Sequence, residues 1–405
     1  MLDSATISRR RLLQAGAAST VMGAPGLLFA QPAGVRIGLL HPVSGALALA
    51  GAQGRMGCQM AIDEINAAGG IKSMGGAKLE AALADSQSRP EVGVSEVERL
   101  NQLGVGAYVG CFSSAIALPA TQAAAKYNTP FLIDVGASDA IVSRGLKNVF
   151  RLAPGNGKVV EDAFAALGTL NKNAGGVAKT AVVVHEDSEF GTTTAKLLAT
   201  KLSAVHIEVK DVIKHATPTR DFSNLVLRIK SLKPDLVIIS NYQNEYVLLA
   251  RTLHQQKVSL AGIFSVMGGG FNFKFVKDLP DVAQYTMDFN HWYNPKNPKA
   301  IAARKAVEAK GGQFSFEVYC GYNAVRLYAD ALERAATADK EKVIAALAAS
   351  TWSAHYMPYG PTKFVNGQNE GGRAVLLQAS KTDIDVIWPD EFASAKAVFP
   401  RPKLG

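Results

Sequence analysis

One unit near the start of the chain, residues 35–71, constrains the fold more than any other stretch. An apolar run at residues 35–40 leads into a loop of small residues at 44–51, which is the pattern of a buried strand that ends in a binding loop. From Met56 onward apolar residues recur at helical spacing until a glycine pair ends the helix. A strand, a loop and an amphipathic helix in this order form the first unit of a parallel sheet covered by helices.

Strand-like and helix-like segments alternate along most of the remaining chain, in two series. The first series ends near residue 152, and the second runs from a helix expected at residues 158–171 to a glycine-rich loop at 267–270. Because strands joined through helices run parallel, ligands are expected at the carboxyl ends of the strands. A chain of 405 residues also exceeds what one hydrophobic core usually serves. We therefore predict an α/β fold with two doubly wound parallel-sheet lobes.

Three aromatic or proline-containing stretches interrupt the alternation, near residue 154, at 291–295 and at 356–361. We interpret them as crossings of the chain between the two lobes. On this interpretation residues 31–153 and 288–358 form the first lobe, and residues 154–287 and 359–405 form the second. Three crossings between two sheets suit a hinged pair of lobes.

Residues 1–30 have the features of a targeting segment. Paired arginines, Arg9 and Arg10, precede a weakly apolar run at residues 15–29, and Ala30 is the expected last residue before cleavage. The apolar run is too short and too rich in glycine and alanine for a membrane span. We predict a twin-arginine export signal and a mature protein located in the periplasm.

Charge, cysteine content and motifs argue against several functions. The formal charge is +9, but no run of Lys and Arg interleaves with aromatic residues, so nucleic acid is not an expected partner. Cys58, Cys111 and Cys320 lie far apart without His or Cys at ligand spacing, so neither a metal nor a cofactor is expected. No G-x-S-x-G motif surrounds Ser113 or Ser114, and no glycine-rich loop ends in Lys-Ser/Thr. An enzyme is therefore the weaker alternative.

A set of short motifs runs through the chain. Its members are Ile37-Gly38-Leu39-Leu40, Pro42, Gly45, Gly51, Gly57, the block at residues 63–71, Trp292-Tyr293, the run at residues 358–361 and Asn366-Gly367-Gln368-Asn369. Together these motifs resemble the periplasmic solute-binding proteins of ABC importers, of the branched-chain amino acid (Leu/Ile/Val) type. The resemblance covers nearly all of residues 35–405 and implies the type I periplasmic binding protein fold, a Venus-flytrap that holds a solute between its lobes. We expect a monomer.

Ser114 is the main candidate for ligand recognition in the first lobe. It is expected where a strand passes into a helix, so its hydroxyl and the free N–H groups of the helix start could hold a carboxylate; a plain N-cap is the alternative. The resemblance implies that Gly136 and Ser138, in the next strand-end loop, hold the same carboxylate. It also implies that Ala46 and Leu47 complete this side of the site.

In the second lobe the resemblance implies two ligand-facing aromatic residues, Phe190 and Tyr242, with core or hinge packing as the alternative for each. Met267 departs from the family pattern. Members that bind α-amino acids commonly place an acid there, because a buried ammonium group is costly without a counter-charge. Either Glu245 or Asp187 substitutes for that acid, or the solute lacks an α-ammonium group and is an organic or aromatic acid or an amide. We favour the second interpretation.

The sequence thus predicts the periplasmic component of an ABC importer. It would bind one small carboxylate-bearing solute, an amino acid or an organic or aromatic acid or amide, and deliver it to an inner-membrane permease. Two alternatives stay open: a ligand sensor of the same fold that reports to a membrane partner, and a periplasmic hydrolase.

Overall fold

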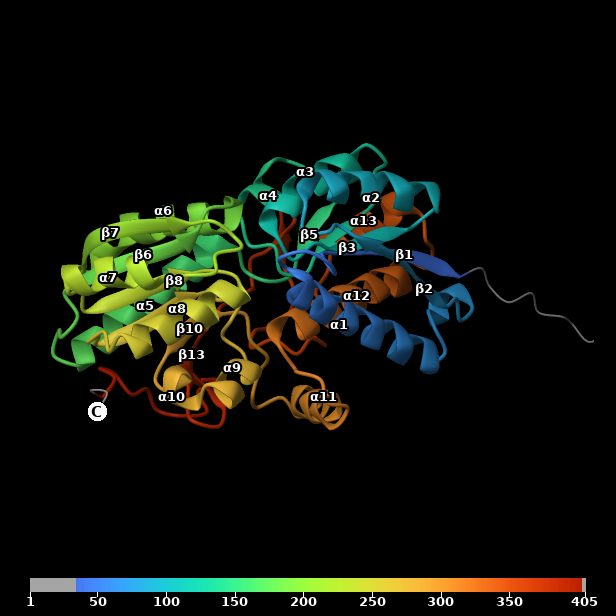
Figure 1. Cartoon of the computed structure of the whole chain (residues 1–405). Helices are drawn as coiled ribbons and strands as arrows, with labels where there is room; N and C mark the ends of the chain where they lie inside the picture. The colour runs from blue at the N-terminus through green and yellow to red at the C-terminus, as the bar shows by residue number, and fades with distance from the viewer. Residues whose placement is uncertain (1–33, 403–405) are drawn as a thin grey trace, which may run out of the picture.

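A computed structural model describes residues 34–402 and shows two lobes side by side, each built on a seven-stranded sheet (Figure 1). The expected export signal lies outside the described residues. None of the described helices combines the length and the apolar character that a membrane crossing requires.

The sheet of the first lobe has the strand order β11-β12-β5-β4-β3-β1-β2. Its strands are β1 (Val35–His41), β2 (Leu79–Asp85), β3 (Ala107–Gly110), β4 (Phe131–Ile133), β5 (Val149–Arg151), β11 (Phe364–Val365) and β12 (Gln368–Asn369). The accompanying helices are α1 (Ala48–Ala67), α2 (Pro90–Gln102), α3 (Ser114–Ala125), α4 (Ala140–Ser143), α12 (Phe316–Ala335), α13 (Lys340–Ala348) and the 3₁₀ turn η1 (Lys72–Met74). The central strands β1 to β5 pair in parallel, as the strand–helix alternation predicts.

The sheet of the second lobe has the order β14-β13-β10-β9-β8-β6-β7. Its strands are β6 (Thr180–Glu186), β7 (Glu208–His215), β8 (Leu236–Ser240), β9 (Gly262–Val266), β10 (Met287–Asn290), β13 (Val375–Ala379) and β14 (Ile384–Trp388). The further helices are α5 (Asn156–Asn173), α6 (Glu189–Lys201), η2 (Leu202–Val205), α7 (Ser223–Leu232), α8 (Gln243–Gln255), α9 (Phe273–Asp278), α10 (Pro280–Ala283) and α11 (Pro298–Ala309). β6 to β10 are parallel, whereas β13 and β14 add two antiparallel strands at one edge.

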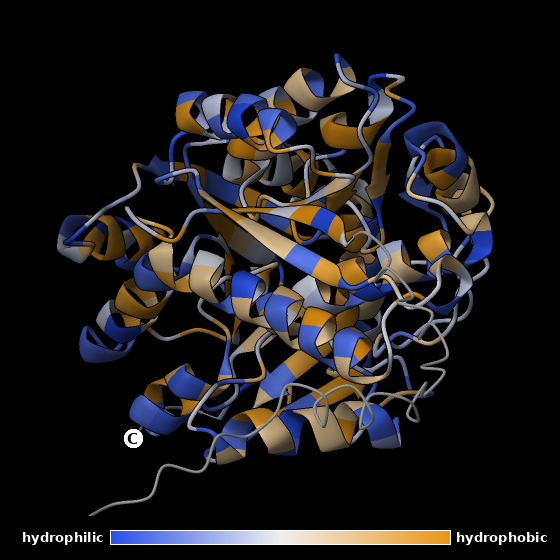
Figure 2. Ribbon diagram, turned by 90° about the vertical axis from the view of Figure 1, so that its right-hand side faces the viewer, coloured by the Kyte–Doolittle hydropathy of each residue, from blue (hydrophilic) through white to orange (hydrophobic). Residues whose placement is uncertain are grey.

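Both sheets have the burial expected of parallel strands that helices cover on two faces. Every residue of β3, β8 and β9 is buried. Figure 2 shows the complementary pattern on the helices, where hydrophilic residues gather on the faces turned away from the sheets. The predicted class, two α/β lobes on parallel-dominated sheets, is confirmed.

The sheets differ from the expected lobe boundaries at two places. β10 pairs with β9 and β13, so the chain leaves the second sheet only after Asn290, not before residue 288. The β11–β12 hairpin pairs with β5 in the first sheet, so the last crossing follows Asn369. The aromatic run near Tyr356 is not a crossing, because Tyr356 stacks on Tyr322 of α12 in the first lobe, with ring centroids 4.7 Å apart.

Helix α1 also begins earlier than the sequence pattern predicted. Its first residue is Ala48, so half of the expected loop at residues 44–51 is helical. Further along α1 a glycine serves packing: a Cβ at Gly57 would lie 1.8 Å from the carbonyl oxygen of Val318 on α12. The glycines of α1 therefore allow two long helices to approach closely.

Candidate ligand-binding site

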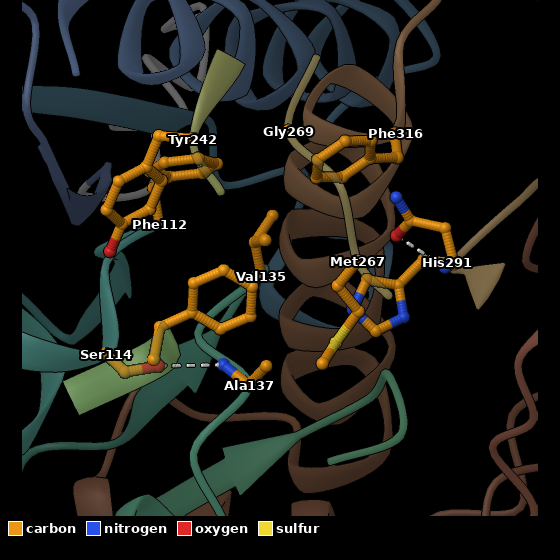
Figure 3. A pocket seen from close by; sticks show the side chains of 11 residues that line it. Phe112, Ser114, Val135, Ala137, Tyr242, Met267, Gly269, His291 and Phe316 are labelled. Carbon is orange, nitrogen blue, oxygen red and sulfur yellow. Dashed lines mark hydrogen bonds between the residues drawn. The ribbon is translucent and has the colours of Figure 1, made fainter. Parts of the chain in front are cut away.

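A cavity lies between the lobes, at the carboxyl ends of strands from both sheets (Figure 3). Its empty volume is about 360 Å³. The lining residues are Phe112, Ser114, Val135, Ala137, Phe190, Tyr242, Met267, Gly269, Asn290, His291 and Phe316. Four of the eight residues predicted from the sequence are among them, namely Ser114, Phe190, Tyr242 and Met267.

Ser114 begins helix α3 and is 1% exposed. Its Oγ accepts hydrogen bonds from the backbone N–H groups of Ala137 and Ser138, each at 3.1 Å. A hydroxyl has two acceptor positions and one donor, so these two bonds leave the hydroxyl proton available to a ligand. The start of a helix also favours negative charge. Ser114 therefore holds the strand-end loop in place and presents a donor at a position suited to a carboxylate.

Gly136 and Ser138 flank the cavity without lining it. The carbonyl oxygen of Gly136 accepts a hydrogen bond from Arg151 Nη1 at 3.0 Å. The Ser138 hydroxyl donates to Glu189 Oε1 at 2.8 Å, and Glu189 opens helix α6 of the second lobe. Ala137, between them, is the member of this loop that lines the cavity. Ser138 thus joins the two lobes.

Ala46 and Leu47 also lie outside the lining. Ala46 is exposed, and Leu47 packs into the core of the first lobe with 7% of its surface exposed. Their loop is tied to the end of β2, because Leu47 N–H donates to Ser88 Oγ at 3.0 Å and Ser44 Oγ donates to Asp85 Oδ2 at 2.6 Å. These bonds hold the loop against the segment that follows β2.

Aromatic rings from both lobes form much of the cavity wall. Tyr242, at the end of β8, lies 5.8 Å from Phe112 and 5.7 Å from Phe190 between ring centroids. Its hydroxyl lies 3.4 Å from Ser113 Oγ in the opposite lobe. Burial, with the nearby charge of Glu186, raises the pKa of Tyr242 above its ordinary value, so the hydroxyl stays protonated.

A buried contact between His41 and Asp134 positions Phe112. The Phe112 N–H donates to Asp134 Oδ1 at 3.0 Å, and His41 Nε2 lies 3.0 Å from Asp134 Oδ2. Burial by itself would raise the pKa of Asp134, but the hydrogen bond and charge of His41 and the N–H groups of Phe112 and Val135 lower it in sum. The ionised Asp134 therefore holds the left-handed backbone of Phe112, at φ 63°, beside the cavity.

No carboxylate lines the cavity within the described residues 34–402. Glu245 is buried outside it and accepts from Thr219 N–H at 3.2 Å, while Asp187 is exposed. Asp288 lies behind the lining, where burial raises its pKa to about 6. Its oxygens accept from Ser265 Oγ at 2.8 Å, Gly268 N–H at 3.0 Å and Asn290 Nδ2 at 2.7 Å. An α-ammonium group would therefore find no acid in the cavity wall beside Met267.

Asn290 and His291 line the cavity, although the sequence interpretation placed His291 in a linker. They end β10 and begin the second crossing. His291 is fully buried, and neither ring nitrogen has a hydrogen-bond partner among the described residues. Burial, together with the charge of Arg151, lowers the pKa of His291 to about 3, so the imidazole is neutral. The polar pair Asn290-His291, at the end of the strand 287–290, was the available signal.

A family described as periplasmic binding protein matches residues 34–383. The chain belongs to the periplasmic binding protein family. This periplasmic binding protein is 32% identical to a Leu/Ile/Val-binding protein of Rhizobium johnstonii, over 77% of its own length and 83% of the relative. It is 27% identical to Leu/Ile/Val-binding protein homolog 8 of Brucella abortus, over 91% and 94% of the two chains.

Solved structures agree on the fold of this periplasmic binding protein. The substrate-binding protein LivJ of Streptococcus pneumoniae, in complex with isoleucine, has a TM-score of 0.74 at 22% identity, with 91% and 100% of the chains covered. A solute-binding protein of R. palustris, in complex with benzoate, has a TM-score of 0.77 at 20% identity, with 90% and 97% covered. The predicted type I fold is confirmed. Family membership indicates a periplasmic or extracellular location, and the relatives are solute-binding proteins of transporters.

Proposed function

We propose that this protein is the receptor of an ABC importer for a small organic or aromatic acid, or its amide, that has no α-ammonium group. The observation that carries the proposal is the composition of the cavity wall, which within residues 34–402 includes no carboxylate. A buried ammonium group without a counter-charge pays a desolvation penalty of several kcal/mol. The site therefore disfavours α-amino acids.

The polar end of such a solute has a suitable partner in Ser114. The hydroxyl proton of Ser114 and the start of α3 favour a negatively charged oxygen. The buried guanidinium of Arg151 supports the same loop from behind, since its Nη1 donates to the carbonyl oxygens of Gly136 and Ser138 at 3.0 and 2.8 Å. The carboxylate of the solute would lie beside the hydroxyl of Ser114.

The apolar part of the solute would lie among Phe112, Phe190, Tyr242 and Phe316. Four rings around one small cavity suit an aromatic or branched apolar group, through offset or edge-to-face contacts. Similar folds hold isoleucine in one solved structure and benzoate in another. The fold thus accommodates either class, and the side chains of the lining favour the acid.

Binding would favour closure of the lobes by a population shift. Ser114 and Phe112 belong to the first lobe, whereas Phe190, Tyr242 and Met267 belong to the second, so a solute touches both lobes only when they are close together. The closed form would then dock on an inner-membrane permease and release the solute, with the receptor acting as a monomer.

Three alternatives predict different results. A receptor for α-amino acids would use Asp187 or Glu245 as its counter-charge, a sensor would bind the same solutes but report to another membrane partner, and a hydrolase would convert the solute. Transport assays in a strain without the receptor separate the importer from the sensor. Recovery of unchanged solute from the complex argues against the hydrolase.

A thermal-shift panel tests the proposed solute class. The panel pairs leucine, phenylalanine and related amino acids with their deaminated acids and amides. We expect the acids or amides to raise the melting temperature and the amino acids to have little effect. Stabilisation by α-amino acids alone would overturn the proposal. The variants Asp187→Asn and Glu245→Gln serve as controls, because loss of binding in either would identify the counter-charge of an amino acid receptor.

A further inference from the structure

His291 differs from the other polar side chains of the cavity wall. Ser114, Tyr242 and Asn290 each have hydrogen-bond partners within the protein. His291 is fully buried, and both Nδ1 and Nε2 lack a partner within residues 34–402. Buried polar atoms are nearly always hydrogen-bonded, so two unpartnered nitrogens on the wall of a ligand cavity indicate that a ligand completes the bonding.

The position of His291 separates it from the proposed carboxylate site. In Figure 3 Ser114 and Ala137 lie on one side of the view and His291 and Phe316 on the other, with Met267 and, higher in the view, Val135 between them. The intervening wall is apolar. A solute that satisfies both sides therefore needs two polar ends with an apolar part between them.

Packing and backbone hydrogen bonds hold His291 in place in the cavity wall. The ring packs against Phe316, with centroids 6.4 Å apart, and its backbone N–H donates to Asn290 Oδ1 at 2.7 Å. The backbone carbonyl accepts from Tyr319 Oη at 3.1 Å. These contacts hold the ring, the backbone N–H and the backbone carbonyl of His291. A neutral imidazole offers one N–H donor and one nitrogen acceptor, which matches a hydroxyl or an amide better than a second charge.

We propose that His291 hydrogen-bonds a second, uncharged polar group of the solute, at the end opposite to its carboxylate. The solute class is then an apolar or aromatic acid with a distal hydroxyl or amide. This inference rests on the proposed function, since it assigns the carboxylate to the Ser114 side. The low pKa of the imidazole agrees with this assignment, because His291 carries no charge in the cavity.

Matched ligand pairs test the inference by titration calorimetry on the mature protein. The pairs are benzoate with 3- and 4-hydroxybenzoate, and phenylacetate with 3- and 4-hydroxyphenylacetate. We expect at least one hydroxylated acid to bind about tenfold more tightly than its parent, because the parent leaves His291 unpartnered. His291→Leu should reduce this ratio to within about twofold, and His291→Gln should retain part of it.

The control His254→Leu makes the same change on α8, outside the cavity lining, and should leave the ratio as in the wild type. If His291→Leu does not fold, His291→Asn replaces it, since the shorter amide cannot reach as far. Equal binding of parent and hydroxylated acids by the wild type, or an unchanged ratio in the His291 variants, would overturn the inference alone. Failure of every acid to bind would overturn the proposed solute class as well.

Discussion

The hydroxyl of Ser138 donates a 2.8 Å hydrogen bond to the carboxylate of Glu189, and this bond connects the first lobe to the second beside the ligand cavity. Ser138 was predicted to hold the ligand, and the structure gives its side chain a partner in the protein instead. Because Ser138 is buried and lies outside the lining, its substitution can separate lobe closure from direct ligand contact.

Ser138→Ala should weaken solute binding by about three- to tenfold, because a hydrogen bond to a charged group that exists only between closed lobes stabilises the binding-competent form. Titration calorimetry measures the affinity, and small-angle scattering measures the fraction of closed protein. Ser143→Ala, on an exposed position of α4, is the control. Unchanged affinity in Ser138→Ala would show that this bond does not contribute to closure.

Ser114→Ala should weaken the binding of acids by about 10- to 100-fold, since it removes a donor to the carboxylate and the acceptor for two backbone N–H groups. The same calorimetric titration provides the measurement, with wild-type melting temperature as the check on folding. A normal affinity in a folded Ser114→Ala protein would exclude Ser114 from carboxylate recognition.

Met267→Asp should reverse the solute preference. Met267 has a left-handed backbone with φ 53°, a conformation that Asp tolerates better than most residues. A carboxylate at this place would lower the affinity for organic acids by about tenfold or more through like-charge repulsion, and it would improve the relative affinity for α-amino acids. Met267→Asn is the uncharged control of similar shape. A shift of equal size in both variants would contradict the electrostatic explanation.

Glu317→Gln should stabilise the protein in a pH-dependent manner. Among residues 34–402 neither oxygen of the buried Glu317 carboxyl has a hydrogen-bond partner, and burial raises its pKa to about 7 from 4.5. A raised carboxyl pKa means that the folded protein retains a proton which the unfolded chain releases, so stability falls as pH rises from about 4.5 to 7. The variant should therefore gain up to about 3 kcal/mol at pH 8 and much less at pH 5.

Urea denaturation at the two pH values measures this difference. Glu341→Gln, at an exposed position in the first turn of α13, is the matched control and should have little effect at either pH. An equal gain for Glu317→Gln at pH 5 and pH 8 would contradict a raised pKa for Glu317, because the gain would then not depend on ionisation of the carboxyl. The stability of Glu317→Gln should still fall as pH rises, but less than that of the wild type, because the pKa of Asp288 is also raised.

Sequence patterns and the family resemblance together sufficed for residues just past a strand end. Ser114, Phe190, Tyr242 and Met267 lie just beyond β3, β6, β8 and β9, and all four line the cavity. A parallel sheet brings its carboxyl ends to one edge, so the strand pattern predicts a residue such as Ser114 there. The family resemblance implied Phe190 and Tyr242 and drew attention to Met267.

Other residues depended on contacts between distant segments. Ala46 and Leu47 also lie just past a strand end, that of β1. Hydrogen bonds to Asp85 and Ser88 nevertheless hold their loop outside the cavity lining. The β11–β12 hairpin lies after the expected last crossing, and its pairing with β5 keeps it in the first sheet. A sequence pattern does not show which neighbour a loop or a short strand will bond.

The sequence by itself determined two α/β lobes, the strand ends that face each other and the family of the protein, because these follow from periodicities and motifs within short stretches. Only the tertiary structure decided that His291 and Phe316, on either side of a crossing, join those strand ends around one cavity. It also decided that Ser138 bonds to the opposite lobe. The physical reason is that burial and the loss of hydrogen-bond partners depend on which distant segments pack together, and this is settled only when the two lobes are assembled.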